Sequence, residues 1–353
     1  MKKYICLFLA LVTVCALLGA CGAATTTETT DAKETKPVMN QNTKPDPSQD
    51  GTLRILMVGN SFCYHYTDEL YALLMENPPE GVTAVEIYNL YYSGCTLTQH
   101  NKWWQQNTGE YELLKFSANG RENLDPKKQW TLENTLKMAN WDYISLQGRP
   151  YGSNYMTDDL TILCAQTGSL AEPLLNRFHE LHPQAQLLWH RTWFFEVGRV
   201  SGDYTYKAED GPRYNAGIQA VCDYMCNEFD KDKDYDLKMV NSGAAWTKAR
   251  ELNETRNLLP EGGLCARLGV VNLGTYPLGQ GLANPGDGYH DGDIGGAQLL
   301  NAYVWYMTIT GNTDLSHSTY KPVYNENGIP RPLSDELIAM LKEAAECVFA
   351  DNT

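Results

Sequence analysis

One segment constrains the fold more than any other. Residues 53–63 read Leu-Arg-Ile-Leu-Met-Val-Gly-Asn-Ser-Phe-Cys. A short aliphatic run of this kind is typical of a strand that is buried on both faces, as in a parallel sheet covered by helices. Gly59 and Asn60 then break the strand, and the turn presents the hydroxyl of Ser61. We therefore expect Ser61 at the carboxyl edge of a parallel sheet, where open α/β sheets bind their ligands.

Strand-like and helical segments alternate along the rest of the chain. We expect strands at residues 53–58, 84–90, 141–147, 186–189 and 237–240. We expect helices at residues 68–75, 131–138, 160–182, 214–229, 294–310 and 334–349. This alternation predicts an α/β fold of three layers, with a central parallel sheet between two layers of helices. Residues 101–130, 191–213 and 250–292 are expected to be loop-rich insertions, which often carry functional groups.

The first residues are typical of an exported bacterial lipoprotein. Two lysines precede an apolar stretch, residues 4–18, that is too short for a permanent membrane span. The following Leu-Gly-Ala-Cys resembles a lipobox, so residues 1–20 are predicted to be a lipoprotein signal peptide and Cys21 the lipidated first residue. An ordinary secretory signal cut near Ala20 or Ala24 is the alternative. We expect a lipid-anchored protein on the extracellular face of the cell membrane. Only its N-terminal lipid is expected to contact the membrane.

A tether and one domain follow the signal. Residues 21–51 are rich in Thr, Lys, Asp and Pro, and residues 22–50 contain no aromatic side chain. Such a segment buries too little apolar surface to order itself, so it is predicted to be disordered. Residues 52–353 are predicted to form one domain, whose length suits an α/β domain with loop insertions.

Charge and cysteine content narrow the function classes. The net charge is −15 for the whole chain. A chain this acidic repels nucleic acid, which is therefore not an expected partner. Seven cysteines follow Cys21, and an odd number in a large domain does not indicate a disulfide framework. Most are expected to be small buried hydrophobic residues, with any pairing left open.

A second motif lies near the C-terminus, where Asp287 and His290 are three residues apart. With Ser61, this pair suggests a serine hydrolase. Gly94 and Gln147 end the second and third expected strands. In this order, the motifs resemble those of the SGNH (GDSL-type) hydrolase superfamily, in a bacterial branch whose serine block reads Gly-Asn-Ser-Phe. The resemblance continues in residues 189–190 and 242–246 and covers roughly residues 53–312.

The resemblance implies a flavodoxin-like fold and a serine esterase that needs neither metal nor cofactor. Ser61 would be the nucleophile, His290 its base, and Asp287 the acid that orients the histidine, with Asp291 and Asp293 as competitors for that role. The backbone N–H groups of Ser61 and Gly94 would stabilise the oxyanion.

Gln147 would be the third oxyanion donor, but it departs from the asparagine that the superfamily has there. Its side chain is one methylene longer, which changes the reach of the amide. In the alternative interpretation, Gln147 orders the loop and is not an oxyanion donor. Asn60, His190 and Trp193 are candidate pocket residues. For His190 and Trp193 a packing role is the alternative.

Two other candidate sites have simpler explanations. Asp230, Asp232, Asp234 and Asp236 alternate like a calcium loop, but the loop lacks the required glycine and glutamate, so a solvated turn is expected. Cys63 lies near Ser61, but no base follows at a recognisable spacing.

The expected function is hydrolysis of an ester, preferentially an O-acyl carbohydrate, outside the cell. Abundant aromatic residues, 22 Tyr and 8 Trp, suit flat sugar faces, although they pack beneath loops equally well. The alternative is a glycan-binding surface lipoprotein that has kept the fold without catalysis, and a third is a surface scaffold without a ligand.

Overall fold

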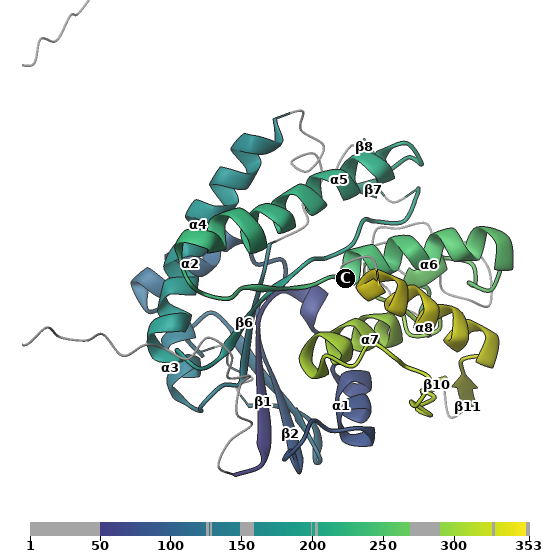
Figure 1. Ribbon diagram of the computed structural model, residues 1–353, viewed down its shortest axis with the longest axis horizontal. Coiled ribbons are helices and arrows are strands. Elements are labelled where there is room, and N and C mark those ends of the chain that lie inside the picture. The colour runs from purple at the N-terminus through teal and green to yellow at the C-terminus, as the bar shows by residue number, and fades with distance from the viewer. Residues whose placement is uncertain are drawn as a thin grey trace, which may run out of the picture. The chain divides into compact units, whose positions relative to one another are not determined.

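Five parallel strands form the centre of the fold (Figure 1). The computed structural model describes residues 50–124, 127, 129–148, 159–198, 200–201, 204–268, 290–326 and 329–350. The predicted signal peptide and nearly all of the predicted tether lie outside these residues. The five strands are β1 (Thr52–Gly59), β2 (Ala84–Tyr91), β5 (Tyr143–Gln147), β6 (Gln186–His190) and β9 (Lys238–Val240).

The order of these strands is β2-β1-β5-β6-β9. This is the flavodoxin-like arrangement, in which the direction of winding reverses between the first and the third parallel strand. Leu56 of β1 pairs with Tyr88 of β2 on one side and with Ile144 of β5 on the other. The expected fold class is thus confirmed, and the switch point lies between the carboxyl ends of β1 and β5.

Two layers of helices cover the sheet (Figure 1). One layer comprises α2 (Leu97–Gln106), α3 (Leu132–Lys137), α4 (Leu160–Leu181) and α5 (Asp210–Asp223). The other comprises α1 (Thr67–Glu76), α6 (Ser242–Arg256), α7 (Ala297–Thr310) and α8 (Asp335–Ala350). Helix α7 is apolar around most of its circumference because it packs between the sheet and its neighbouring helices. No helix in the described part of the chain is long and apolar enough to cross a membrane.

The insertions hold more regular structure than expected. Residues 101–130 were predicted to be loop-rich, but they contain most of α2 and the antiparallel strands β3 (Glu112–Ser117) and β4 (Gly120–Asn123), which extend the sheet beyond β2. A capping box of Thr96 and Gln99 begins α2. The predicted helix 214–229 begins earlier, as α5, and ends in a π-helical turn, Tyr224–Phe229.

Two small hairpins lie outside the main sheet. Strands β7 (Val200–Ser201) and β8 (Tyr204–Thr205) form one, and β10 (Val323–Glu326) and β11 (Ile329–Pro332) form the other. Neither hairpin was expected from the sequence. In the third insertion, α6 extends to Arg256 and a short 3₁₀ turn, Gly263–Cys265, follows. None of the seven cysteines beyond Cys21 forms a disulfide, and five of them are buried, as expected.

Candidate active site

The turn after β1 presents Ser61 beside the switch point of the sheet. Asn60 is extended and caps a 3₁₀ turn, Ser61–Cys63, by accepting a hydrogen bond at Oδ1 from the backbone N–H of Phe62 at 3.1 Å. Its Nδ2 donates to the carbonyl of Cys95 at 3.0 Å. Phe62 and Cys63 are buried, whereas Ser61 is partly exposed. The local sequence therefore leaves the serine as the accessible residue of a well-anchored turn.

Gln147 packs directly against this turn from the end of β5. Its Nε2 donates a hydrogen bond to Oδ1 of Asn60 at 2.6 Å. A Cβ at Gly59 would lie 2.8 Å from Cδ of Gln147, so only glycine allows this close approach. The amide that was predicted to be either an oxyanion donor or a loop support is thus hydrogen-bonded to Asn60, which caps the turn Ser61–Cys63, called the serine turn below.

A buried polar chain continues behind Gln147. Its Oε1 is 3.1 Å from Nδ1 of His190, and Nε2 of His190 is 3.1 Å from Oγ of Ser242. An amide oxygen only accepts, so Nδ1 of His190 carries the proton and Nε2 accepts from the Ser242 hydroxyl. Burial lowers the pKa of His190 to about 3, so the ring is neutral. His190 therefore supports the turn from behind, which agrees with the packing alternative.

Gly94 lies in the loop that follows β2. Its φ of +67° is in the left-handed region that favours glycine. The adjacent turn is closed by a hydrogen bond from the backbone N–H of Cys95 to the carbonyl of Tyr92 at 3.1 Å. Because Asn60 binds the carbonyl of Cys95, the Gly94 loop is tied to the serine turn.

His290 reaches the serine turn from a distant part of the chain. Its ring centroid lies 5.8 Å from that of Phe62, the residue after Ser61. It also lies 5.3 Å from the ring of His65 in an edge-to-face arrangement, with an interplanar angle of 75°. The structure thus brings His290 to the turn predicted to carry the nucleophile. Asp287 lies outside the described residues.

A histidine–aspartate pair that the sequence analysis missed lies beside His290. Nδ1 of His65 is 2.8 Å from Oδ1 of Asp291. The Asp291 carboxylate is fully buried, whereas His65 is 19% exposed. Burial raises the pKa of Asp291, but His65, Arg267 and His290 together outweigh it and lower the pKa. Asp291 was a named competitor for the acid that orients His290, but no sequence pattern paired it with His65, because 226 positions separate the two residues.

Trp193, one of the candidate pocket residues, is a packing residue, and Trp103 packs in a similar way. Trp193 is fully buried and stacks on Trp246, with centroids 4.4 Å apart and an interplanar angle of 5°. Its ring centroid also lies 4.8 Å from that of Phe62. Trp103 is partly buried and packs edge-to-face on Tyr92 at 4.7 Å. Trp193 thus supports the serine turn by packing against Phe62.

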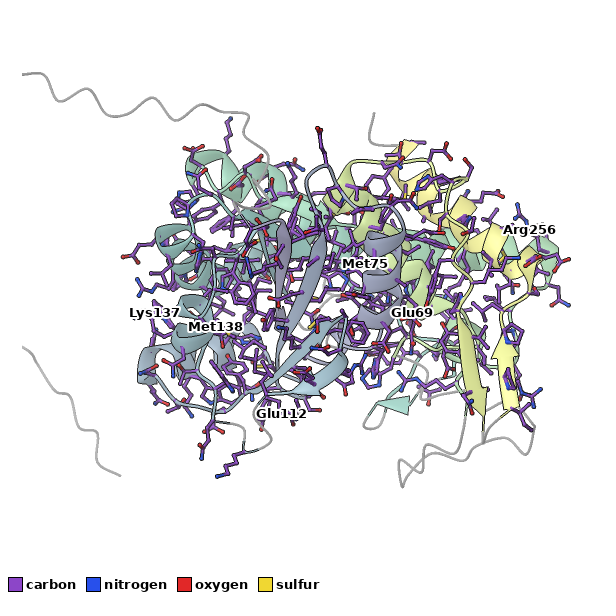
Figure 2. The ribbon with its side chains drawn as sticks, turned by 90° about the horizontal axis from the view of Figure 1, so that it is seen from below. Glu69, Met75, Glu112, Lys137, Met138 and Arg256 are labelled. Carbon is purple, nitrogen blue, oxygen red and sulfur yellow. The ribbon has the colours of Figure 1, made fainter. Side chains whose placement is uncertain are left out.

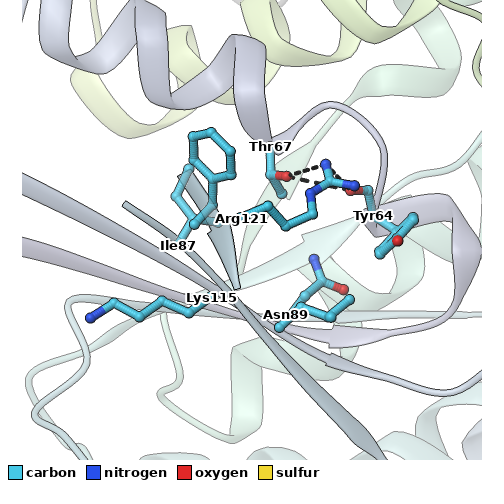
Figure 3. A pocket seen from close by; sticks show the side chains of 8 residues that line it. Tyr64, Thr67, Ile87, Asn89, Lys115 and Arg121 are labelled. Atoms are coloured by element: carbon cyan, nitrogen blue, oxygen red, sulfur yellow. Dashed lines mark hydrogen bonds between the residues drawn. The ribbon is translucent and has the colours of Figure 1, made fainter. Parts of the chain in front are cut away.

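A small pocket lies beside the segment that follows the serine turn (Figure 3). It is lined by Tyr64, Thr67, Ile87, Asn89, Leu114, Lys115, Phe116 and Arg121. Arg121 crosses it and donates hydrogen bonds to Oγ1 of Thr67 at 3.0 Å and to Asp68 at 2.7 Å. Its guanidinium also lies 4.8 Å from the ring of Tyr64. These contacts satisfy the arginine, so it supports the region around Tyr64.

Two rejected candidates are explained by their contacts. Cys63 is 1% exposed, its Sγ donates to the carbonyl of Asn60 at 3.1 Å, and burial raises the pKa of its thiol. It is therefore unsuited to act as a nucleophile. Asp230 accepts hydrogen bonds from the backbone N–H groups of Tyr235 and Leu237, which closes a turn. Among the described residues, no cluster of His, Cys, Asp and Glu has the arrangement of a metal site.

Comparison with known proteins agrees with this architecture. Residues 54–211 match the family DUF4886, a domain of unknown function. The structure resembles that of a DUF4886 family protein from Bacteroides uniformis, at 20% identity over 85% of this chain and 95% of that chain, with a TM-score of 0.57. No protein of curated function matches the chain.

Two further likenesses have lower scores. A proposed GDSL-like lipase from Parabacteroides merdae matches at 17% identity over 73% of this chain and 95% of that chain, with a TM-score of 0.41. A family 3 carbohydrate esterase from Clostridium thermocellum matches at 16% identity over 73% of this chain and 94% of that chain, with a TM-score of 0.37. At such identities a structural likeness concerns the fold and leaves the reaction open.

Proposed function

We propose that the chain is a serine esterase or deacetylase, because residues 54–211 match the DUF4886 family and the sheet has the strand order expected for the SGNH (GDSL-type) superfamily. One observation carries the proposal. His290 lies against Phe62 although 228 positions separate them in the sequence, so a histidine meets the serine turn at the switch point. A serine and a histidine at the carboxyl ends of parallel strands fit nucleophilic catalysis.

The reaction would proceed in two similar steps. His290 takes the proton of Ser61 while the serine oxygen attacks the ester carbonyl, and the carbonyl oxygen becomes negative. The backbone N–H groups of Ser61 and Gly94 receive that charge. Collapse breaks the ester C–O bond, and the alcohol leaves with the proton from His290. Water then releases the acid by the same route, with Asp287 orienting His290. This chemistry requires no metal or cofactor.

The proposed substrate is an O-acyl carbohydrate outside the cell. The lipobox-like segment ending at Cys21 supports an anchored, extracellular protein, with a signal at residues 1–20 and a tether at residues 21–51. The net charge of −15 disfavours polyanionic substrates. A neutral acetylated glycan meets both conditions.

A glycan-binding protein without catalysis is the second candidate. The observation that favours it is the hydrogen bond of the Gln147 amide to Asn60, which commits one proton of the third predicted oxyanion donor to the turn. In that case, sugar binding would persist without turnover.

A labelling experiment separates the two. The protein is treated with a serine-reactive phosphonate, its turnover of acetyl esters is measured, and the modified residue is located by mass spectrometry. We expect loss of turnover with modification at Ser61 in wild type, and no modification in Ser61→Ala. Ser93→Ala is the control, because Ser93 is an exposed serine of the Gly94 loop. Glycan binding without turnover or labelling would replace the esterase by the binding protein.

A further inference from the structure

The pair of His65 and Asp291 is built into a rigid part of the site. Oδ1 of Asp291 binds His65 at 2.8 Å, and Oδ2 accepts a hydrogen bond from Nδ2 of Asn301 at 3.3 Å. The amide of Asn301 is fixed in turn, since its Oδ1 accepts from Nε1 of Trp246 at 2.8 Å. Asp291, Asn301 and Trp246 are all fully buried. This chain of contacts joins His65, four residues after Ser61, to α7 and α6.

The backbone of Asp291 and Gly292, next to His290, is also fixed by hydrogen bonds. The carbonyl of Asp291 accepts hydrogen bonds from Arg267 at 3.0 Å and from the side chain of Gln298 at 3.3 Å. The next residue, Gly292, donates its N–H to the carbonyl of Leu264 at 3.0 Å. Asp291 therefore anchors the chain position next to His290 through its side chain and its backbone together.

The second contact runs through the histidine rings. A carboxylate only accepts hydrogen bonds, so Nδ1 of His65 is the donor to Asp291, which fixes the orientation of the His65 ring. That ring meets His290 edge-to-face at 5.3 Å, an arrangement in which the positive edge of one ring faces the π-system of the other. The orientation of His290 is thus tied to Asp291 through space as well as along the chain.

We propose that Asp291 and His65 form a positioning pair for His290, holding its ring and stabilising the positive charge that it acquires when it takes the serine proton. The pair acts through His290, so the inference rests on the proposed function. It adds a carboxylate other than Asp287 to the machinery of the site.

The charges around His290 agree with this role. Asp291 supplies a negative charge in direct contact with His65, and Arg267 supplies a positive charge 3.4 Å from Nδ1 of His65. Cys63, Tyr66 and Glu69 lie on the packed segment after β1, and burial raises the pKa of each, so all three favour their neutral forms. Asp291 thus supplies a negative charge beside the two histidines.

Substitution of Asp291 by Asn tests the proposal, because Asn keeps the shape and removes the charge. We expect kcat/KM at neutral pH to fall on the order of 10²-fold, mainly through kcat. The acid limb of the pH profile should move to lower pH by about one unit, since loss of a nearby negative charge lowers the pKa of the base. Asp335→Asn is the control, because Asp335 is an exposed aspartate of α8 that pairs with Lys321 at 2.6 Å and has no part in the proposed chemistry. Its acid limb should stay in place.

Variants of His65 keep the test decisive if Asp291→Asn does not fold. His65 is partly exposed, so its replacement should leave the fold intact. We expect His65→Ala to lower kcat at least about 10-fold with little change in KM, and His65→Asn, which retains a donor for Asp291, to recover part of the loss. An unchanged kcat in a folded His65→Ala protein would overturn the proposal.

Proton NMR of the histidine rings separates this inference from the proposed function. The His290 signal, assigned with His290→Gln, should titrate at lower pH in Asp291→Asn than in wild type whether or not the protein hydrolyses esters. A shift in a protein without esterase activity would support the pair and reject the esterase. An unmoved titration and an unmoved acid limb, with turnover that depends on Ser61, would reject the pair and keep the esterase.

Discussion

The side-chain amide of Gln147 donates a 2.6 Å hydrogen bond to Oδ1 of Asn60, the residue immediately before Ser61. This contact joins the end of β5 to the turn after β1, across the point where the sheet reverses its winding. It continues through His190 to Ser242, so four side chains that are at most 2% exposed fix the rear of the serine turn. Removing any of them leaves a buried polar partner unsatisfied.

Gln147→Ala should destabilise the protein. Nδ1 of His190 loses its acceptor and Oδ1 of Asn60 loses one donor, so the free energy of unfolding should fall by about 1–3 kcal/mol. Gln147→Asn should give an intermediate value, because its shorter side chain cannot reach both partners. Urea unfolding followed by tryptophan fluorescence measures both. Unchanged stability in Gln147→Ala, together with a kcat lowered by about 10²–10³-fold, would instead assign the amide to the oxyanion.

Ser61→Ala should abolish turnover without affecting the fold. We expect kcat to fall by a factor on the order of 10⁴–10⁶, as for removal of a nucleophile from other serine hydrolases. The melting temperature should stay near that of wild type, because Ser61 is partly exposed and its neighbour Asn60 provides the cap of the turn. Esterase kinetics and thermal unfolding of the same preparation check both statements. Near-normal turnover in the folded variant would remove Ser61 from the mechanism.

Cys63 should be inert although it lies two residues from Ser61. Its thiol is buried, hydrogen-bonded to the carbonyl of Asn60, and held in the neutral form by a raised pKa. Native protein treated with iodoacetamide should carry no label on Cys63, whereas the urea-unfolded protein should carry it. Cys63→Ala should retain kcat within about threefold, since the thiol takes no part in the chemistry. Rapid native labelling accompanied by loss of activity would contradict this.

Glu69 should make stability depend on pH. It lies on α1 (Figure 2). The hydroxyl of Tyr324 donates a hydrogen bond to its Oε1 at 3.1 Å. Burial, assisted by the charges of Asp68 and Asp291, raises its pKa from 4.5 to about 8. The folded state therefore binds the proton more tightly than the unfolded state. The stabilisation is complete below pH 4.5 and is lost as the pH rises through about 8.

Glu69→Gln tests this dependence, because a neutral amide replaces the neutral acid. Between pH 5 and pH 9 the wild type should lose unfolding free energy at up to about 1.4 kcal/mol per pH unit, and the variant should lose distinctly less. Urea unfolding at several pH values gives the two slopes. Glu112→Gln is a suitable control, since Glu112 is a partly exposed glutamate of β3. Parallel slopes for wild type and Glu69→Gln would contradict the assignment.

The predicted lipid anchor is tested at the mature N-terminus. If Cys21 is lipidated, mass spectrometry should find a diacylglyceryl group on it and no residue before it. Cys21→Ala should release the protein from the membrane fraction into the medium. An unmodified N-terminus at another residue would favour the ordinary secretory signal.

The sequence by itself determined where the parallel strands and most helices lie along the chain, and the place of Ser61 at the end of the first strand. These features are local, because a buried aliphatic run, a glycine and an asparagine specify a strand and its turn within about ten residues. It did not predict the hairpin of β3 and β4. Those strands lie at the sheet edge, where the apolar alternation that marks a strand is weak: β4 reads Gly-Arg-Glu-Asn.

Only the tertiary structure decided which side chains meet. His65 and Asp291 are 226 positions apart, and no spacing in the sequence relates them. Likewise, the partner of Gln147 depends on β1 and β5 being neighbours in the sheet, which places two strand ends within hydrogen-bond distance. A pattern along the chain indicates which residues are buried and which are exposed. Polar pairs such as His65 with Asp291 form only when helices and strands pack together, because a buried polar group needs a hydrogen-bond partner.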